Sequence, residues 1–299
     1  MPDTILTLET SSQRLRVLPT LGAGIASWEI RNAQTWQPML RPWDGVSEDR
    51  YTFACFPLVP WSNRISGGGF GEGSMFYQVL PNRVGEPYPI HGDGWLQPWT
   101  VTAKGAQHVV LRLESECYKG NPYHYEATLT CMLGEAELNL TLTATHLGDN
   151  PLPYGLGLHP YFLRNESTRL TMPCSGVWLS GDDPLPVAHT EMLPPGFDYR
   201  QPAPLNGQLI DHCLTGWSGQ SDISYPDHCL QLEMTMRDCD GYVLFYRPPL
   251  GDFFCMEPIT HPIDAFHLPG QPGLKVLNKG EFLTLETTLR VRAMPSAGK

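Results

Sequence analysis

The residues best suited to chemistry are a histidine and a glutamate, each isolated in an apolar segment. His159 lies in the run YGLGLHPYF at 154–162, where the tyrosines are the only other ionisable groups. Glu257 is the one carboxylate in FFCMEP at 253–258. Apolar surroundings readily shift a pKa, and a buried carboxylate without a partner is costly. Since proline follows both residues and favours extended backbone before it, the two are candidates for an acid–base pair on stiff segments.

Polar residues also interrupt two further segments and a weaker third one. Asn63 and Arg64 lie in the proline- and aromatic-rich run FPLVPWSNRI, and His91 lies in PIHGDGW, whose glycines allow close approach of the backbone. Asp211 lies in LIDH. Each also has a purely structural explanation. Asn63 and Arg64 could form a turn with a surface ion pair, His91 could bond a loop carbonyl, and Asp211 could be a turn residue. A single histidine such as His159 is likewise most often a core residue.

The rest of the chain predicts an all-β fold. Alternation of apolar and polar residues marks the segments 4–8, 14–18, 109–113, 125–131, 137–145, 229–236, 242–246 and 283–291. Gly and Pro contribute 29 residues each, and no segment of eleven or more residues shows helical periodicity. We expect one domain over residues 1–299, a large antiparallel β-sandwich with its site on a concave face. Residues 181–208 are expected to form a surface excursion, Gly67–Gly69 a tight turn, and 294–299 a frayed tail.

Composition limits the partners and the chemistry. The net charge of −11 disfavours nucleic acid and anionic membranes. Eight cysteines without C-x-x-C spacing give no indication of a zinc ribbon or a thioredoxin-like site, and several are expected to be small core residues. Nucleotide-binding glycine loops and the G-x-S-x-G elbow are absent. With no apparent signal peptide or transmembrane span, we expect a cytoplasmic protein that needs no cofactor and no metal.

Several of these segments together resemble a known family. The runs PLVPWSNRI, IHG, GLHPYF, IDH and EP occur in this order. They resemble the aldose 1-epimerases, or galactose mutarotases, from about residue 20 to residue 290. The resemblance implies the galactose mutarotase-like supersandwich, in agreement with the alternation above. The run GLHPYF differs from the Asn-His-Ser-Tyr-Phe type of the best-known galactose mutarotases, which indicates a divergent bacterial-type branch.

The resemblance also implies roles for the candidate residues. Asn63, Arg64, His91 and Asp211 would bind the sugar, while His159 would be the general acid and Glu257 the general base. The reaction would interconvert the α and β anomers of a hexose such as glucose or galactose through ring opening. A base ionised near neutral pH and an imidazole acid suit this chemistry. The expected partner is a small-molecule aldose, bound by a monomer or a homodimer.

Three alternatives remain open at this level. A hexose-6-phosphate 1-epimerase on the same scaffold would need converging cations, for which the candidates are Arg64, Arg83, Arg247 and Lys275. A non-catalytic carbohydrate-binding protein would not need both His159 and Glu257. A glycoside hydrolase would pair Asp211 with Glu257 and leave the histidines unexplained. His212, His261 and His267 have no assigned role, although His261 could line the same cleft; the aromatic residues that could stack on a sugar are Trp61, Trp95, Tyr161 and Phe162.

Overall fold

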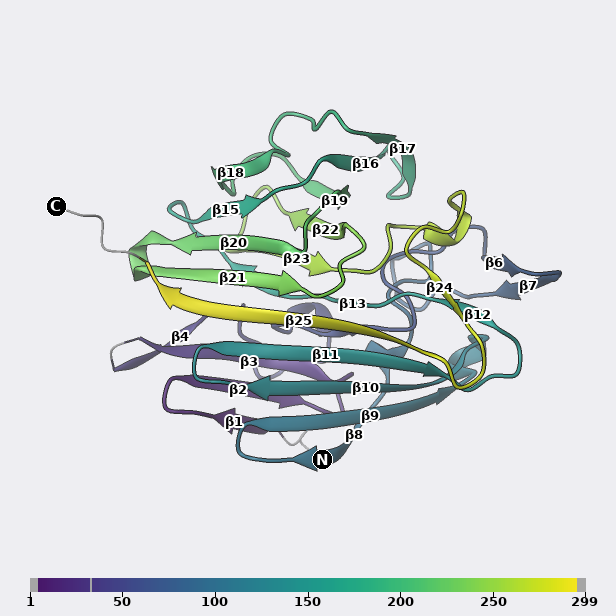
Figure 1. The fold of residues 1–299 in the computed structure, drawn as a ribbon, viewed down its shortest axis with the longest axis horizontal. Helices are drawn as coiled ribbons and strands as arrows, with labels where there is room; N and C mark the ends of the chain where they lie inside the picture. The colour runs from purple at the N-terminus through teal and green to yellow at the C-terminus, as the bar shows by residue number, and fades with distance from the viewer. Residues whose placement is uncertain (1–4, 33, 295–299) are drawn as a thin grey trace.

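The computed structural model describes residues 5–32 and 34–294, and these residues form an all-β fold of antiparallel sheets (Figure 1), as predicted. Within this range the helices are five 3-10 turns: η1 (Arg50–Thr52), η2 (Gly94–Leu96), η3 (Tyr118–Gly120), η4 (Pro226–His228) and η5 (Ala265–His267). None of them has the length and apolar character needed to cross a bilayer.

The largest sheet has nine strands in the order β18-β15-β20-β21-β25-β11-β10-β9-β8. Their bounds are β8 (Thr100–Lys104), β9 (His108–Glu116), β10 (His124–Leu133), β11 (Glu137–His146), β15 (Arg169–Met172), β18 (Tyr199–Pro204), β20 (Gln220–Tyr225), β21 (Leu230–Met236) and β25 (Phe282–Ala293). Buried and more exposed residues alternate along β10, β11 and β21, as the sequence pattern predicts. The predicted strands at 109–113, 125–131, 137–145, 229–236 and 283–291 all fall within this sheet.

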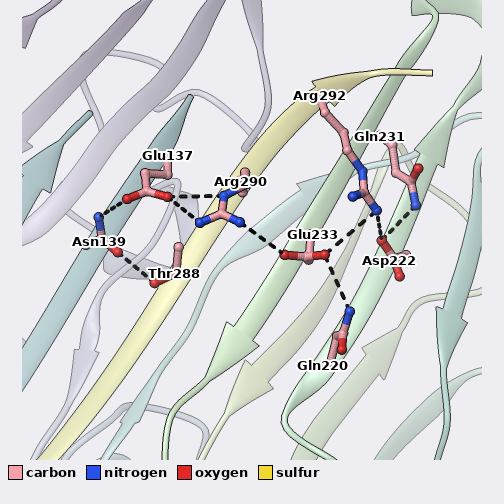
Figure 2. Close-up of polar contacts among 9 residues, drawn as sticks. All are labelled: Glu137, Asn139, Gln220, Asp222, Gln231, Glu233, Thr288, Arg290 and Arg292. Carbon is pink, nitrogen blue, oxygen red and sulfur yellow. Dashed lines mark hydrogen bonds and ion pairs between the residues drawn. The ribbon is translucent and has the colours of Figure 1, made fainter. Parts of the chain in front are cut away.

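The outward face of this sheet is polar. Figure 2 shows Glu137, Arg290, Glu233 and Arg292 linked across β11, β25 and β21, with Asp222 of β20 at the end of the chain of contacts. Such exposed pairs each add little stability. The alternating charges nevertheless keep this face of the sheet hydrated and oppose its association with apolar surfaces. The arrangement is therefore that of a sheet with one buried face and one solvated face.

There are two further large sheets. In the view of Figure 1 the purple one lies behind the nine-stranded sheet, and part of the other extends above it, at the top. One contains β1 (Leu6–Glu9), β2 (Gln13–Leu18), β3 (Gly24–Asn32) and β4 (Thr35–Pro38). The other has the order β14-β23-β22-β19-β16-β17, with bounds β14 (Tyr161–Leu163), β16 (Gly176–Ser180), β17 (Pro186–Thr190), β19 (Ile210–Thr215), β22 (Tyr242–Arg247) and β23 (Phe253–Pro258). One buried apolar cluster includes residues of all three sheets, among them Val17, Leu142 and Phe245. The sheets therefore pack through a shared core.

Three strand pairs complete the fold. They are β5 (Pro57–Leu58) with β13 (Gly157–Leu158), β6 (Gly69–Glu72) with β7 (Met75–Gln78), and β12 (Leu152–Tyr154) with β24 (Lys275–Leu277). The pairing of β5 with β13 joins the segment before Asn63 to the segment before His159. Two elements far apart in the sequence are thereby fixed beside each other.

Residues 181–208 are mostly exposed, as expected for a surface excursion, but they also contain regular secondary structure. They contain β17 and β18, each of which adds an edge strand to a large sheet. The backbone groups of this Pro- and Gly-rich segment are thus partly satisfied by sheet pairing. Gly67 and Gly68 form the expected turn, with φ of 62° and 74°. The predicted tail lies outside the described residues except for Met294, and residue 4 of the first predicted strand also lies outside them.

Candidate active site

A cavity of about 360 Å³ opens between the six-stranded sheet and the loops near β5. Its volume is that of about 12 liquid waters at roughly 30 Å³ each, which is on the scale of one monosaccharide. All six residues singled out from the sequence line it: Asn63, Arg64, His91, His159, Asp211 and Glu257. The other lining residues are Arg41, Tyr51, Glu86, Ile90, Tyr161, Leu244, Tyr246 and Phe253.

The six-stranded sheet supplies one wall of the cavity. Side chains two residues apart on a strand share a face, so Leu244 and Tyr246 of β22 point the same way. The strand register places Leu244 opposite Glu257 of β23 and Tyr246 opposite Asp211 of β19. Two carboxylates from different strands are therefore carried on one face of the sheet, separated by the apolar residues of β22.

Asn63 and His91 form the opposite wall by holding each other in place. The backbone N–H of His91 donates to the carbonyl of Asn63 at 2.9 Å, and the N–H of Asn63 donates to Nδ1 of His91 at 3.0 Å. Both residues have positive φ, and a Cβ on Gly92 would lie 2.0 Å from the carbonyl oxygen of Val59. Because Nδ1 accepts a hydrogen bond, the neutral ring carries its proton on Nε2. Burial lowers the pKa of His91 well below its usual value, which keeps this ring neutral.

His159 is fixed by stacking on both sides. Its ring lies 4.7 Å from that of Phe56 at an interplanar angle of 22°, and 4.7 Å from that of Tyr161 at 17°. Its backbone N–H donates to the carbonyl of Phe56 at 3.0 Å. Arg41 lies over the Tyr161 ring, 3.9 Å from its centre. The imidazole orientation is thus set by packing, with one edge turned toward Glu257.

His159 and Glu257 form a buried pair. Nε2 of His159 lies 3.3 Å from Oε1 of Glu257, and the two side chains are 7% and 1% exposed. Neither carboxylate oxygen has a hydrogen-bond partner within the described residues, and neither does Nδ1 of His159. Burial raises the pKa of Glu257 well above its usual range, assisted by the negative charge of Asp211, and lowers the pKa of His159 to about 3. Both shifts favour the uncharged forms, so burial favours one proton held on the carboxyl group over an ion pair.

Arg64 provides fixed positive charge at the cavity. Its guanidinium lies 3.1 Å from Glu86 and donates to the side-chain oxygen of Asn63 at 3.2 Å. Burial raises the pKa of Asp211, and the charge of Arg64 opposes this rise. The charge of Arg64 also opposes the rise in the pKa of Glu257. Arg64 therefore lowers the cost of ionising the two carboxyl groups, although burial still raises the pKa of both.

Tyr51 and Arg41 were not identified from the sequence. The hydroxyl of Tyr51 is buried without a hydrogen-bond partner among the described residues, and burial raises its pKa, so the group stays protonated. Arg83 lies over the Tyr51 ring at 3.5 Å. Arg41 donates to the backbone oxygen of Tyr51. No sequence signal pointed to these contacts, because the segment Arg50–Thr52 is polar and has neither an apolar run nor a recognisable motif.

The three other histidines considered from the sequence do not line the cavity. His261 is fully buried; its Nε2 accepts from the N–H of Ser62 at 3.1 Å and its Nδ1 donates to the carbonyl of Pro262 at 2.8 Å. It therefore holds the backbone of Ser62, next to Asn63, and does not line the cavity. Nδ1 of His212 accepts from the backbone N–H of Asp211 at 3.1 Å, so His212 contacts a cavity residue without lining the cavity itself. His267 bonds to Asp264, which lies outside the cavity lining. Of the four aromatic residues proposed for sugar stacking, Tyr161 lines the cavity and the others are buried elsewhere.

The cations proposed for a phosphate do not converge. Of the four, Arg64 lines the cavity, where Glu86 offsets its charge. Arg83 pairs with Asp49 at 3.3 Å. Arg247 is buried and donates to backbone oxygens and to the Tyr199 hydroxyl, and Lys275 is exposed on β24. Arg41 also lines the cavity, so the lining carries two arginines, Arg41 and Arg64, against three carboxyl groups, those of Glu86, Asp211 and Glu257.

Comparisons with known proteins give a consistent result. The family model for aldose 1-epimerase matches residues 4–290. The uncharacterised protein YphB of Escherichia coli K12 is 35% identical over 297 residues, covering 96% of this chain and 99% of YphB. The crystal structure of a candidate aldose 1-epimerase from Escherichia coli K12 superimposes with a TM-score of 0.91 at 34% identity, covering 97% of this chain and 99% of that one. A GalM/aldose epimerase homologue from Caenorhabditis elegans shares the fold, with a TM-score of 0.82 at 17% identity over 98% of this chain and 100% of that one. The chain belongs to the aldose 1-epimerase family.

Proposed function

We propose that the protein is an aldose 1-epimerase that interconverts the α and β anomers of an unphosphorylated hexose. The observation that carries the proposal is the buried pair of His159 and Glu257, 3.3 Å apart, in a cavity of monosaccharide size. Among the residues that the structure describes, the carboxylate has no other partner. An unpaired buried carboxylate is costly, and a bound sugar hydroxyl would supply the missing partner.

The proposed reaction proceeds through the ion-pair form, with Glu257 ionised and His159 protonated. Burial by itself disfavours this form, and hydrogen bonds from a bound sugar to the carboxylate would stabilise it. Glu257 takes the proton of the C1 hydroxyl, the bond between C1 and the ring oxygen breaks, and His159 gives its proton to that oxygen. The open-chain aldehyde turns about C1–C2 and recloses by the reverse steps. Ring opening converts a charged pair into a neutral pair with the same number of protons. Since burial favours the neutral pair, the free energy of ring opening would be lower in the site than in water.

The other polar residues would bind and orient the sugar. His91 would offer Nε2–H as a neutral donor toward the ring oxygen, where negative charge develops. Asp211 and Asn63 would bind hydroxyl groups. Arg64 would contact the sugar, and its positive charge would lower the cost of ionising Glu257. The hydroxyl of Tyr51 would donate one further hydrogen bond to the sugar.

Polarimetry tests this function directly. Freshly dissolved α-D-glucose and α-D-galactose should approach anomeric equilibrium faster with the protein than without it. His159→Ala should remove the acceleration. Acceleration with hexose 6-phosphates alone would replace the substrate class proposed here, and no acceleration with any of these sugars would overturn the assignment as a 1-epimerase in favour of a sugar-binding protein.

A further inference from the structure

A thiol lies beside the buried acid–base pair and has no role in the proposed reaction. Cys255 precedes Glu257 by two residues on β23, so both side chains are on the same face of the sheet. The register places Cys255 opposite Tyr161, which follows His159 by two residues. One ligand atom from each of His159, Cys255 and Glu257 lies within 4.8 Å of the other two, and all three residues are buried. A nitrogen, a sulfur and an oxygen ligand atom thus lie close to one another.

The separations fit a tetrahedral ion. Zn²⁺ binds nitrogen and oxygen at about 2.0–2.1 Å, so two such ligands at the tetrahedral angle are roughly 3.3 Å apart. Nε2 of His159 and Oε1 of Glu257 are 3.3 Å apart. The sulfur of Cys255 lies within 4.8 Å of both ligand atoms, and it would have to move to about 2.3 Å from such an ion to bind it. The histidine and the carboxylate already have the spacing of two ligands of one ion.

The ligand atoms are also uncommitted. Both oxygens of Glu257 lack a hydrogen-bond partner among the described residues. Cys255 is a free thiol. The combination of thiolate and imidazole selects zinc-like ions over Mg²⁺ and Ca²⁺, which prefer sets of oxygen ligands. His159 and Glu257 line the cavity, so an ion can approach from that side and keep its fourth position there for water.

We propose that His159, Cys255 and Glu257 form a binding site for one divalent cation of the Zn²⁺ type. The Cys255 thiol gives its proton to solvent as it binds the ion. The ion blocks sugar turnover, because it occupies the carboxylate and the imidazole nitrogen that would exchange protons with the sugar. This inhibition rests on the proposed function, whereas the binding of the ion does not.

Co²⁺ serves as the spectroscopic probe. The full-length protein is treated with a chelator, the chelator is removed, and Co²⁺ is titrated in while the near-ultraviolet and visible spectra are recorded. We expect one ion per chain, a thiolate-to-cobalt charge-transfer band, and loss of the spectrum when Zn²⁺ displaces Co²⁺. Cys255→Ser should abolish the charge-transfer band and weaken Zn²⁺ binding at least tenfold. Cys213→Ser is the matched control, because Cys213 is fully buried in the same apolar cluster but lies outside the ligand set, and it should bind as the wild type does.

Three results would overturn the metal site: no stoichiometric binding to the wild type, binding without a thiolate band, or Cys255→Ser binding within tenfold of the wild type. Near-ultraviolet circular dichroism checks that each variant is folded. If Cys255→Ser does not fold, His159→Ala provides the same test, because it should also weaken Zn²⁺ binding at least tenfold.

Turnover gives a separate readout. In the wild type, Zn²⁺ should inhibit sugar mutarotation and Mg²⁺ at the same concentration should not. High sugar concentration should relieve the inhibition, because sugar and ion compete for the same atoms. A protein that binds Co²⁺ through Cys255 yet accelerates no mutarotation would contradict the proposed function and leave the metal site intact. Mutarotation that proceeds unchanged with the ion bound would overturn the inhibition.

Discussion

Glu257→Gln should make the protein more stable at alkaline pH while removing its activity. Burial raises the pKa of Glu257 above its unfolded value of 4.5, so the folded protein resists ionisation of this group more than the unfolded chain does. The contribution of the protonated Glu257 carboxyl to the free energy of unfolding is fully present below pH 4.5, and it is lost as the pH rises through the pKa of the folded state. Above pH 4.5, Glu257 therefore favours unfolding.

Glutamine has nearly the same shape and no charge. An unsatisfied buried polar group costs about 1–3 kcal/mol, and more when it is ionised. We expect Glu257→Gln to raise the free energy of unfolding at pH 8 by about 1–3 kcal/mol, or Tm by roughly 2–6 °C. At pH 4 the gain should disappear, because the wild-type carboxyl is then protonated in both states. Loss of the general base should lower kcat by roughly 10²–10⁴-fold.

Glu86→Gln is the matched control. Glu86 lines the same cavity but pairs with Arg64 at 3.1 Å. Its replacement should therefore lower the free energy of unfolding instead of raising it, because the largely buried Arg64 loses its partner. Thermal unfolding by calorimetry at pH 8 and pH 4, with polarimetry for kcat, measures both effects. A Glu257→Gln protein that is no more stable than the wild type at pH 8, or equally more stable at pH 4, would refute the argument from burial.

Three further substitutions test separate parts of the site. His159→Ala should lower kcat by roughly 10²–10⁴-fold in polarimetry with an unchanged near-ultraviolet spectrum, and near wild-type turnover would remove it from the mechanism. Tyr51→Phe should raise KM about 2- to 10-fold through loss of one hydrogen bond to the sugar. Tyr225→Phe is its control and should leave KM unchanged, because the Tyr225 hydroxyl is also buried with no partner in the described part of the chain but lies outside the cavity; equal KM values for the two variants would contradict the role of Tyr51. Gly92→Ala should lower Tm, because its Cβ would lie 2.0 Å from the carbonyl oxygen of Val59 at a φ of 64°, and an unchanged Tm would show that this loop adapts.

Much of the fold was predictable because one face of each long strand is buried. The alternation at 137–145 and 283–291 reappears as β11 and β25, the central pair of the nine-stranded sheet. The excursion at 181–208 was only partly predicted. Its strands β17 and β18 are short and mostly exposed, so they leave little alternation in the sequence.

What the sequence alone determined was the all-β class and the chemical type of the site residues. His159 and Glu257 stood out because ionisable groups in apolar runs are rare and require a reason. Their contact at 3.3 Å was decided only by the tertiary structure, through the pairing of β5 with β13 and of β14 with β23. These pairings join segments distant in the chain, and no local pattern encodes them.

The tertiary structure also decided which of several similar residues belong to the site. His91 precedes Gly92 and His261 precedes Pro262, and neither sequence context shows which histidine belongs to the site. In the structure, His261 accepts a hydrogen bond from the backbone N–H of Ser62, whereas His91 lines the cavity. Tyr51 enters the cavity because Arg83 and Arg41 hold its ring and its backbone. A sequence states which donors and acceptors a chain contains, but their partners, and therefore their pKa values and roles, depend on where packing places them.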